Sequence, residues 1–159
     1  MRVLVIRHGE AVPQGTRGLS DADRPLTADG ERRFRASAVA IARVVPKPDV
    51  LLASPLLRAR QTAALMAAAW RDIEPQPEPA LASGSVDAIL TTLERHPRGA
   101  TVVLVGHEPL VSALLGELLG VMSSEAISFE PGAAALLELG SPARRSGRLL
   151  WFLPPDVSQ

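Results

Sequence analysis

The chain has 159 residues, of which 47% are hydrophobic and 21% charged, and its 17 basic residues balance its 17 acidic ones. These values are typical of a globular chain with a hydrophobic core, and we expect residues 1–159 to form a single domain. The zero net charge gives no general attraction for nucleic acid or an anionic membrane, so neither is expected as a partner. The lack of cysteine excludes disulfides, thiolate catalysis and sulfur-ligated metals.

The start of the chain predicts neither export nor membrane insertion. No charged leader with an apolar segment precedes the first predicted strand, and no stretch approaches the roughly 18 apolar residues of a membrane span. We therefore expect a cytoplasmic protein, and we expect it to be a monomer.

The first predicted strand is Val3–Ile6, a short apolar run rich in β-branched residues. The polar segment that follows, Glu10–Asp23, is expected to be a loop. Thr27 is expected to cap a helix over residues 28–44, and the Pro46–Pro48 segment ends this helix.

A second strand and helix follow. Asp49–Ala53 is the predicted strand, and Ser54 and Pro55 have the residue types of an N-cap and a first helical position for a helix that runs to about Trp70. The proline-rich segment Glu74–Pro79 is expected to be irregular, with a short edge strand as the alternative.

The second half of the chain continues this alternation. We expect helices over Ser85–Arg95 and Pro109–Leu119, a central strand over Thr101–Val105, and two final strands over Ala133–Leu139 and Arg148–Leu153. The alternation predicts an α/β fold: a three-layer α/β/α sandwich with a mostly parallel central sheet, in which the last pair supplies one antiparallel member.

Arg7-His8-Gly9 follows the first predicted strand directly. Open α/β sheets hold their ligands beyond the carboxyl ends of their strands. A neutral imidazole is a good nucleophile near neutral pH, and a guanidinium group is a natural partner of a phosphoryl oxygen. The triplet therefore indicates a histidine that attacks phosphorus, with a purely structural histidine as the alternative.

Two further strand ends carry reactive groups. The second strand leads into Ser54-Pro55-Leu56-Leu57-Arg58, which places Arg58 about one turn into a helix whose first N–H groups face the same rim. The central strand leads into Gly106-His107-Glu108-Pro109. Because the carboxyl ends of parallel strands share one edge of a sheet, we expect the two arginines and two histidines of these segments to converge on one anion.

In order along the chain, these segments resemble the signatures of the histidine phosphatase superfamily. The matching segments are Arg7-His8-Gly9-Glu10, Arg24-Pro25-Leu26-Thr27 with Gly30, Ser54–Thr62 and Gly106–Leu110. They cover residues 2 to about 120, and within the superfamily they are most similar to the small SixA-type phosphohistidine phosphatases. The resemblance implies a phosphoglycerate mutase-like fold and a phosphatase that needs no metal or other cofactor.

By the same resemblance, His8 is the histidine that is phosphorylated transiently. The phosphate pocket is completed by Arg7, Arg58 and His107, and the two arginines would hold the equatorial phosphoryl oxygens. We expect His8 to be neutral at its attacking nitrogen, with a backbone carbonyl holding the other ring nitrogen. His107, when protonated, would be a third cationic donor, a form that a bound dianion favours.

Superfamily members that cleave phosphate esters use a carboxylic acid to protonate the alkoxide leaving group. The segment expected to supply it, Pro79–Ser85, contains no acid; Glu78 and Asp87 flank it, and Glu10 and Glu108 lie near the pocket on other loops. Imidazole, with a pKa near 6.5, leaves with little proton assistance. The missing acid therefore favours P–N over P–O cleavage, and the lack of long insertions favours an open pocket suited to a histidine on a protein surface.

Other candidate residues have simpler interpretations. Arg24 is expected to line the mouth of the pocket or to anchor its own loop. Thr62 is expected to contribute to helix packing, and Arg60 is expected to face solvent. A metal site made of His8, His107 and a carboxylate is disfavoured, because two guanidinium groups repel a dication.

Three functions remain open. The first is a phosphohistidine phosphatase of signal transduction that acts on a phosphorylated protein, such as a histidine phosphotransfer domain. The second is a phosphomonoesterase that acts on a small phosphate ester. The third is a non-catalytic module that binds phosphohistidine, which the presence of all four pocket residues disfavours.

Overall fold

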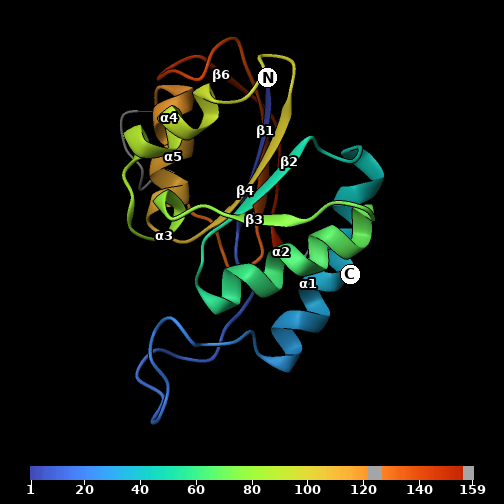
Figure 1. Cartoon of the computed structure of the whole chain (residues 1–159), viewed down its shortest axis with the longest axis vertical. Helices are drawn as coiled ribbons and strands as arrows, with labels where there is room; N and C mark the ends of the chain where they lie inside the picture. Colours follow the sequence, from blue (N-terminus) through green and yellow to red (C-terminus); the bar gives the residue numbers. More distant parts are fainter. Residues whose placement is uncertain (122–126, 156–159) are drawn as a thin grey trace.

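The strands are β1 (Arg2–Arg7), β2 (Val50–Ala53), β3 (Pro75–Pro77), β4 (Thr101–Gly106), β5 (Ala134–Leu139) and β6 (Gly147–Leu153). The helices are α1 (Ala28–Val44), α2 (Leu57–Trp70), α3 (Ala80–Ser83), α4 (Val86–Glu94) and α5 (Leu110–Leu119). The computed structural model describes residues 1–121 and 127–155 and joins these strands in one sheet, in the order β3-β2-β4-β1-β5-β6 (Figure 1). No helix in the described part of the chain is long and apolar enough to cross a bilayer.

The sheet is mostly parallel. β1 and β2 both pair in parallel with β4, and β3 pairs in parallel with β2, whereas β5 runs antiparallel to both β1 and β6. Helical crossovers join the parallel strands, and a short turn joins β5 to β6. The predicted α/β sandwich is therefore confirmed, with β5 as its antiparallel member.

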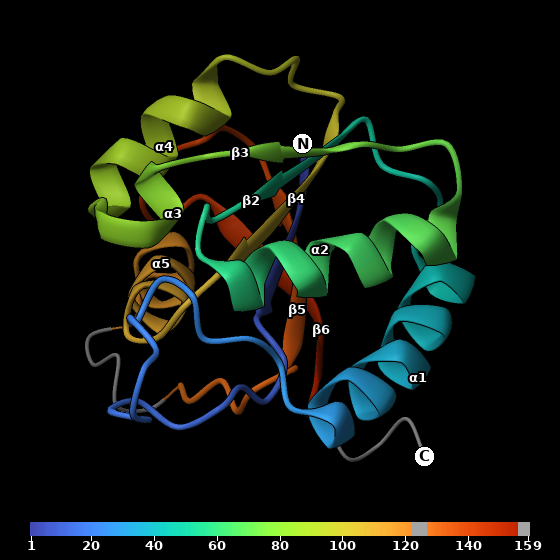
Figure 2. The same ribbon diagram turned by 60° about the horizontal axis from the view of Figure 1, so that its bottom comes forward.

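Helices cover both faces of the sheet. Successive side chains of a strand point to opposite faces, so Val3 and Val5 pack with α4 and α5, whereas Leu4 and Ile6 pack with α1 and α2. Figure 2 shows α1 and α2 on one side of the sheet and α3, α4 and α5 on the other. This two-sided burial explains why β1 is apolar at every one of these positions rather than at alternate ones.

The start of α2 differs from the prediction. The helix begins at Leu57 rather than Pro55, and Leu56 at its N-cap makes no side-chain capping bond. The Ser54 hydroxyl accepts a hydrogen bond from the Leu56 N–H at 3.3 Å, but it does not cap the helix and contacts the site described below. Arg58 is consequently the second residue of α2, closer to the helix N-terminus than expected.

Two short elements occupy the segment between α2 and α4. β3 confirms the edge strand expected as the alternative for Glu74–Pro79, and prolines fit there because an edge strand has N–H positions with no partner strand. α3 was not predicted, since four residues are too few to show a helical period. Its first N–H group donates to the Glu78 carboxylate at 3.0 Å, which gives that carboxylate a structural role.

The carboxyl ends of β1, β2 and β4 lie at one edge of the sheet. The register pairs Arg7 with Gly106 and Ala53 with Val105, so the residues that follow these strands start level with one another. The loop of residues 8–27, between β1 and α1, extends past this edge (Figure 1). Segments that are distant in the sequence therefore meet there.

Gly30 is required where this loop joins α1. The Thr27 hydroxyl caps α1 as predicted, accepting from the Gly30 N–H at 2.9 Å, and the Thr27 N–H donates to the Glu10 carbonyl oxygen at 3.0 Å. A Cβ atom at Gly30 would overlap that same Glu10 oxygen. Glycine is thus needed here for close packing of the loop against the helix.

We predict that Gly30→Ala lowers the free energy of unfolding by about 1–3 kcal/mol, because the added methyl group forces the loop away from α1. Helix propensity alone favours alanine at this position, so any net decrease in the free energy of unfolding must come from the packing clash. Urea denaturation measures the change. Gly99→Ala is the matched control, since a Cβ atom at the exposed Gly99 meets no atom within 4 Å; equal stability of the two variants would contradict this account.

Candidate active site

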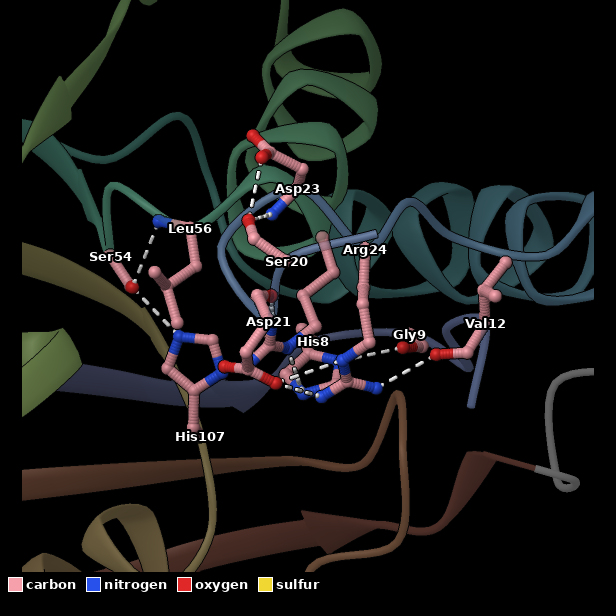
Figure 3. Close-up of polar contacts among 11 residues, drawn as sticks. His8, Gly9, Val12, Ser20, Asp21, Asp23, Arg24, Ser54, Leu56 and His107 are labelled. Atoms are coloured by element: carbon pink, nitrogen blue, oxygen red, sulfur yellow. Dashed lines mark hydrogen bonds and ion pairs between the residues drawn. The ribbon is translucent and has the colours of Figure 1, made fainter. Parts of the chain in front are cut away.

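His8 lies directly beyond β1 with only 8% of its surface exposed. Its Nδ1 is 2.7 Å from the Gly9 carbonyl oxygen (Figure 3). A carbonyl oxygen only accepts hydrogen bonds, so Nδ1 carries the proton and Nε2 keeps a lone pair. Burial, together with the nearby His107, Arg58 and Arg7, lowers the pKa of His8 to about 3 against the opposing effect of the Gly9 contact. The ring is therefore neutral near neutral pH, with its Nε2 lone pair on the side of Arg58, which is the state expected of a nucleophile.

Arg58 projects from the first turn of α2 onto this nucleophile. Its Nε donates to His8 Nε2 at 3.3 Å, and its Nη1 and Nη2 donate to the backbone carbonyl oxygen and the carboxylate of Asp21 at 2.6 Å and 3.1 Å. The side chain is almost completely buried. The predicted meeting of Arg58 with His8 is thus present, and Asp21 is an additional member that the sequence analysis missed.

Thr62 connects the two segments that carry His8 and Arg58. Its hydroxyl accepts from the Gly9 N–H at 3.0 Å and donates to the Arg58 carbonyl oxygen at 2.8 Å. The interpretation of Thr62 as a packing residue is therefore incomplete, because its hydroxyl holds the backbone beside the nucleophile. Arg60, two residues beyond Arg58, is exposed as expected.

His107 faces His8 from the end of β4, with 4.9 Å between the ring centroids. Its Nε2 is 2.7 Å from the Ser54 hydroxyl oxygen (Figure 3). Burial first, and then the positive charge of Arg58, lowers the pKa of His107 to about 4. His107 is therefore neutral near neutral pH in the free protein, and it becomes a cationic donor only if a bound anion raises its pKa again.

Arg7 is held by the segment that precedes β5. Its Nη1 donates to the Phe129 carbonyl oxygen at 2.5 Å, and the Phe129 N–H donates to the Glu108 carboxylate at 2.9 Å. That carboxylate also accepts from the Ser112 hydroxyl at 2.5 Å. Glu108 thus positions Arg7 through the backbone of one residue, Phe129. Burial lowers the pKa of Arg7, partly offset by Glu108 and Glu130.

Arg24 both lines the site and anchors its own loop. Its Nη1 donates to the Val12 carbonyl oxygen at 2.8 Å, and its Nε donates to the Asp21 carboxylate at 2.9 Å. Although partial burial acts in the opposite direction, the hydrogen bonds from Arg24 and Arg58 keep the pKa of Asp21 below its usual range. No motif signals Asp21, because Arg58 lies 37 positions away and the three-residue spacing from Arg24 within a loop forms no recognisable pattern.

These side chains surround a cavity of about 440 Å³. Its charged or ionisable wall residues are Arg7, His8, Glu10, Asp21, Arg24, Arg58, His107 and Glu108. The Arg7 Nε and His107 Nδ1 atoms are buried and have no hydrogen-bond partner among the described residues. With their neighbouring cations they can bind a tetrahedral oxyanion beside the His8 nucleophile.

The segment expected to supply an acid, Pro79–Ser85, brings no carboxylate to this cavity among its described side chains. Residues 79–85 reach the wall through Ala82. Glu78 is occupied by α3 and by the Thr92 hydroxyl, 3.1 Å away, and Asp87 pairs with Arg144 at 2.7 Å. Among the described residues, no group of three or more His, Cys, Asp or Glu side chains is arranged to hold a metal ion.

Thr62→Val is predicted to lower the free energy of unfolding by about 1–3 kcal/mol, because the buried Gly9 N–H loses its acceptor. Urea denaturation of this variant, with Thr62→Ser as the control that keeps the hydroxyl, measures the effect. If Thr62 served packing alone, the isosteric valine would leave stability unchanged.

The low pKa values of His8 and His107, about 3 and about 4, predict that both rings stay neutral in the free protein above about pH 5. In the unfolded chain both titrate near 6.5, so that chain binds more protons between about pH 4 and 6.5. The free energy of unfolding should therefore rise with pH across this window. NMR titration of the ring C–H resonances and urea denaturation at several pH values test this; a His8 resonance that titrates near 6.5 would disprove it.

Comparison with known proteins agrees with this geometry. The model of the histidine phosphatase superfamily (branch 1) matches residues 3–86. An uncharacterized protein of Picosynechococcus sp. is 42% identical over 112 residues, which are 69% of this chain and 67% of that protein. Phosphohistidine phosphatase SixA of Escherichia coli (strain K12) is 32% identical over 123 residues, 74% of each chain.

A solved structure shows the same relationship in three dimensions. The protein histidine phosphatase SixA complexed with tungstate superposes with a TM-score of 0.84 and 27% identity, and the match covers 100% of both chains. The sheet and its helices thus have the phosphoglycerate mutase-like fold. This chain belongs to the histidine phosphatase superfamily and is a phosphatase of the SixA type.

Proposed function

We propose that this protein is a phosphohistidine phosphatase that removes phosphate from a phosphorylated histidine of another protein, through a covalent phosphohistidine on His8. The observation that carries the proposal is the state of His8: Nδ1 is tied to the Gly9 carbonyl, and the lone pair of Nε2 lies beside Arg58. The SixA relatives named above support the same substrate class.

The reaction has two steps. In the first, His8 Nε2 bonds to phosphorus as the P–N bond of the substrate breaks, and the departing imidazole takes a proton from solvent. In the second, a water oxygen bonds to phosphorus as the P–Nε2 bond breaks, and its electron pair returns to Nε2. The water gives up one proton to solvent, and phosphate leaves. Arg58 must first release Nε2, because the lone pair that accepts its N–H is the one that attacks.

Catalysis comes from positioning and charge. Arg7 and Arg58 hold the equatorial oxygens, whose negative charge is spread out in a loose transition state. His107 supplies a further N–H donor, and a bound dianion shifts it toward its cationic form. None of these groups requires a metal, so the reaction proceeds on side chains alone.

The leaving group decides between the proposed reaction and ester hydrolysis. The described part of residues 79–85 brings no carboxylate to the cavity, and Glu108 is engaged with Phe129 and Ser112. Glu10, the other acid candidate on the wall, lies 3.8 Å from Arg33. An alkoxide leaving group needs a strong acid, whereas imidazole does not. This favours a phosphorylated protein, such as a histidine phosphotransfer domain in the cytoplasm, over a small phosphate ester.

We predict that the protein releases phosphate faster from a phosphorylated histidine phosphotransfer domain than from sugar or glycerate phosphates. His8→Ala should abolish release, and Arg58→Ala should slow it roughly 10²- to 10³-fold, as expected for loss of one oxyanion donor. Arg60→Ala is the matched control, because it removes an exposed arginine from the same helix outside the cavity.

Rapid acid-free quenching should trap acid-labile phosphate on His8. Faster cleavage of esters than of phosphohistidine would replace the proposal by a phosphomonoesterase. Tight binding of the phosphorylated domain without phosphate release would indicate a binding module instead.

A further inference from the structure

Asp21 places a carboxylate among the cations of the site. One of its oxygens accepts a hydrogen bond from Arg24 Nε (Figure 3), and the other accepts one from Arg58 Nη2. The same carboxylate interacts electrostatically with His107, and it lies on the wall of the cavity that His8 also lines. Asp21 therefore contacts or faces groups that the proposed function assigns to the phosphoryl group.

The Asp21 side chain can leave this position without moving its loop. The Asp21 backbone carbonyl accepts separately from Arg58 Nη1 at 2.6 Å, and the Ala22 carbonyl accepts from the Leu57 N–H at 2.9 Å. These backbone contacts fasten the loop to α2 independently of the carboxylate. The side chain itself is 45% exposed, so it can rotate into solvent.

We propose that Asp21 sets the affinity of the pocket for the phosphoryl group: its carboxylate competes for Arg58 and is displaced when a phosphorylated ligand binds. The inference rests on the proposed function only in that this cavity holds the phosphoryl group. Displacement weakens the binding of any phosphate. Inorganic phosphate has no other contacts to offset that cost, whereas a phosphorylated protein makes further contacts around the mouth.

Asp21 thereby favours release of the product. After hydrolysis the remaining ligand is inorganic phosphate, which binds through the phosphoryl group alone. Return of the carboxylate to Arg58 replaces the lost phosphate contact and keeps the free ion from occupying the pocket. Asp21 acts here only on the binding of phosphate and takes part in no proton transfer.

The test is the dissociation constant of inorganic phosphate, measured by isothermal titration calorimetry at fixed pH and ionic strength. Asp21→Asn should tighten phosphate binding roughly fivefold relative to the unmodified protein, the upper range for a partly exposed ion pair. Asp21→Ala should bind at least as tightly, because asparagine keeps an oxygen that accepts from arginine. Asp23→Asn is the matched control: it removes one charge from the same loop, where the Asp23 carboxylate accepts from Ser20.

Unchanged phosphate binding in both Asp21 variants overturns the proposal, and weaker binding assigns Asp21 to holding Arg58 in place. Equal tightening in Asp21→Asn and Asp23→Asn also overturns it, since net charge would then account for the effect. The measurement needs no turnover. A protein that fails to hydrolyse phosphohistidine would therefore leave this inference standing. If neither the unmodified protein nor any variant binds inorganic phosphate, both proposals are wrong.

Discussion

The hydrogen bond between His8 Nδ1 and the Gly9 carbonyl oxygen is the contact on which the chemistry of this site depends. It assigns the proton to Nδ1 and leaves the lone pair on Nε2, the atom beside Arg58. The contact by itself stabilises the charged imidazolium, which could not attack phosphorus. Burial and the surrounding cations outweigh it and bring the pKa of His8 to about 3. The same desolvation that keeps the nucleophile neutral also lowers the pKa of Arg7.

The fold holds this arrangement through contacts between separate segments. Thr62 joins the backbone of Gly9 to α2, and so links the segment that carries His8 to the helix that carries Arg58. Glu108 accepts from the Phe129 N–H, and the carbonyl oxygen of the same residue accepts from Arg7. Arg7 is thus positioned before a ligand binds, as expected for a preorganised donor. Arg58 is instead engaged with His8 and Asp21 and must exchange these contacts for those of a ligand.

A pocket lined by several cations would also bind inorganic phosphate, the product of the proposed reaction, and slow its release. Asp21 balances the charge of Arg24 and Arg58 with a carboxylate that remains partly exposed. The backbone contacts between the loop and α2 do not involve the carboxylate, so we infer that it can leave Arg58 while the loop stays in place. On this proposal, a phosphoryl group that binds Arg58 takes the place of the Asp21 carboxylate.

The sequence alone determined the α/β architecture and predicted that Arg7, His8, Arg58 and His107 would lie at one edge of the sheet, because apolar runs mark the strands and the ends of parallel strands share one edge. Only the tertiary structure decided the roles of Asp21, Ser54 and Thr62. Their partners Arg58, His107 and Gly9 lie 37, 53 and 53 positions away, respectively. Local spacing favours reading a serine before proline as a helix cap and a helical threonine as packing. Contacts over such separations depend on how the loops cross the edge of the sheet, which no local pattern encodes.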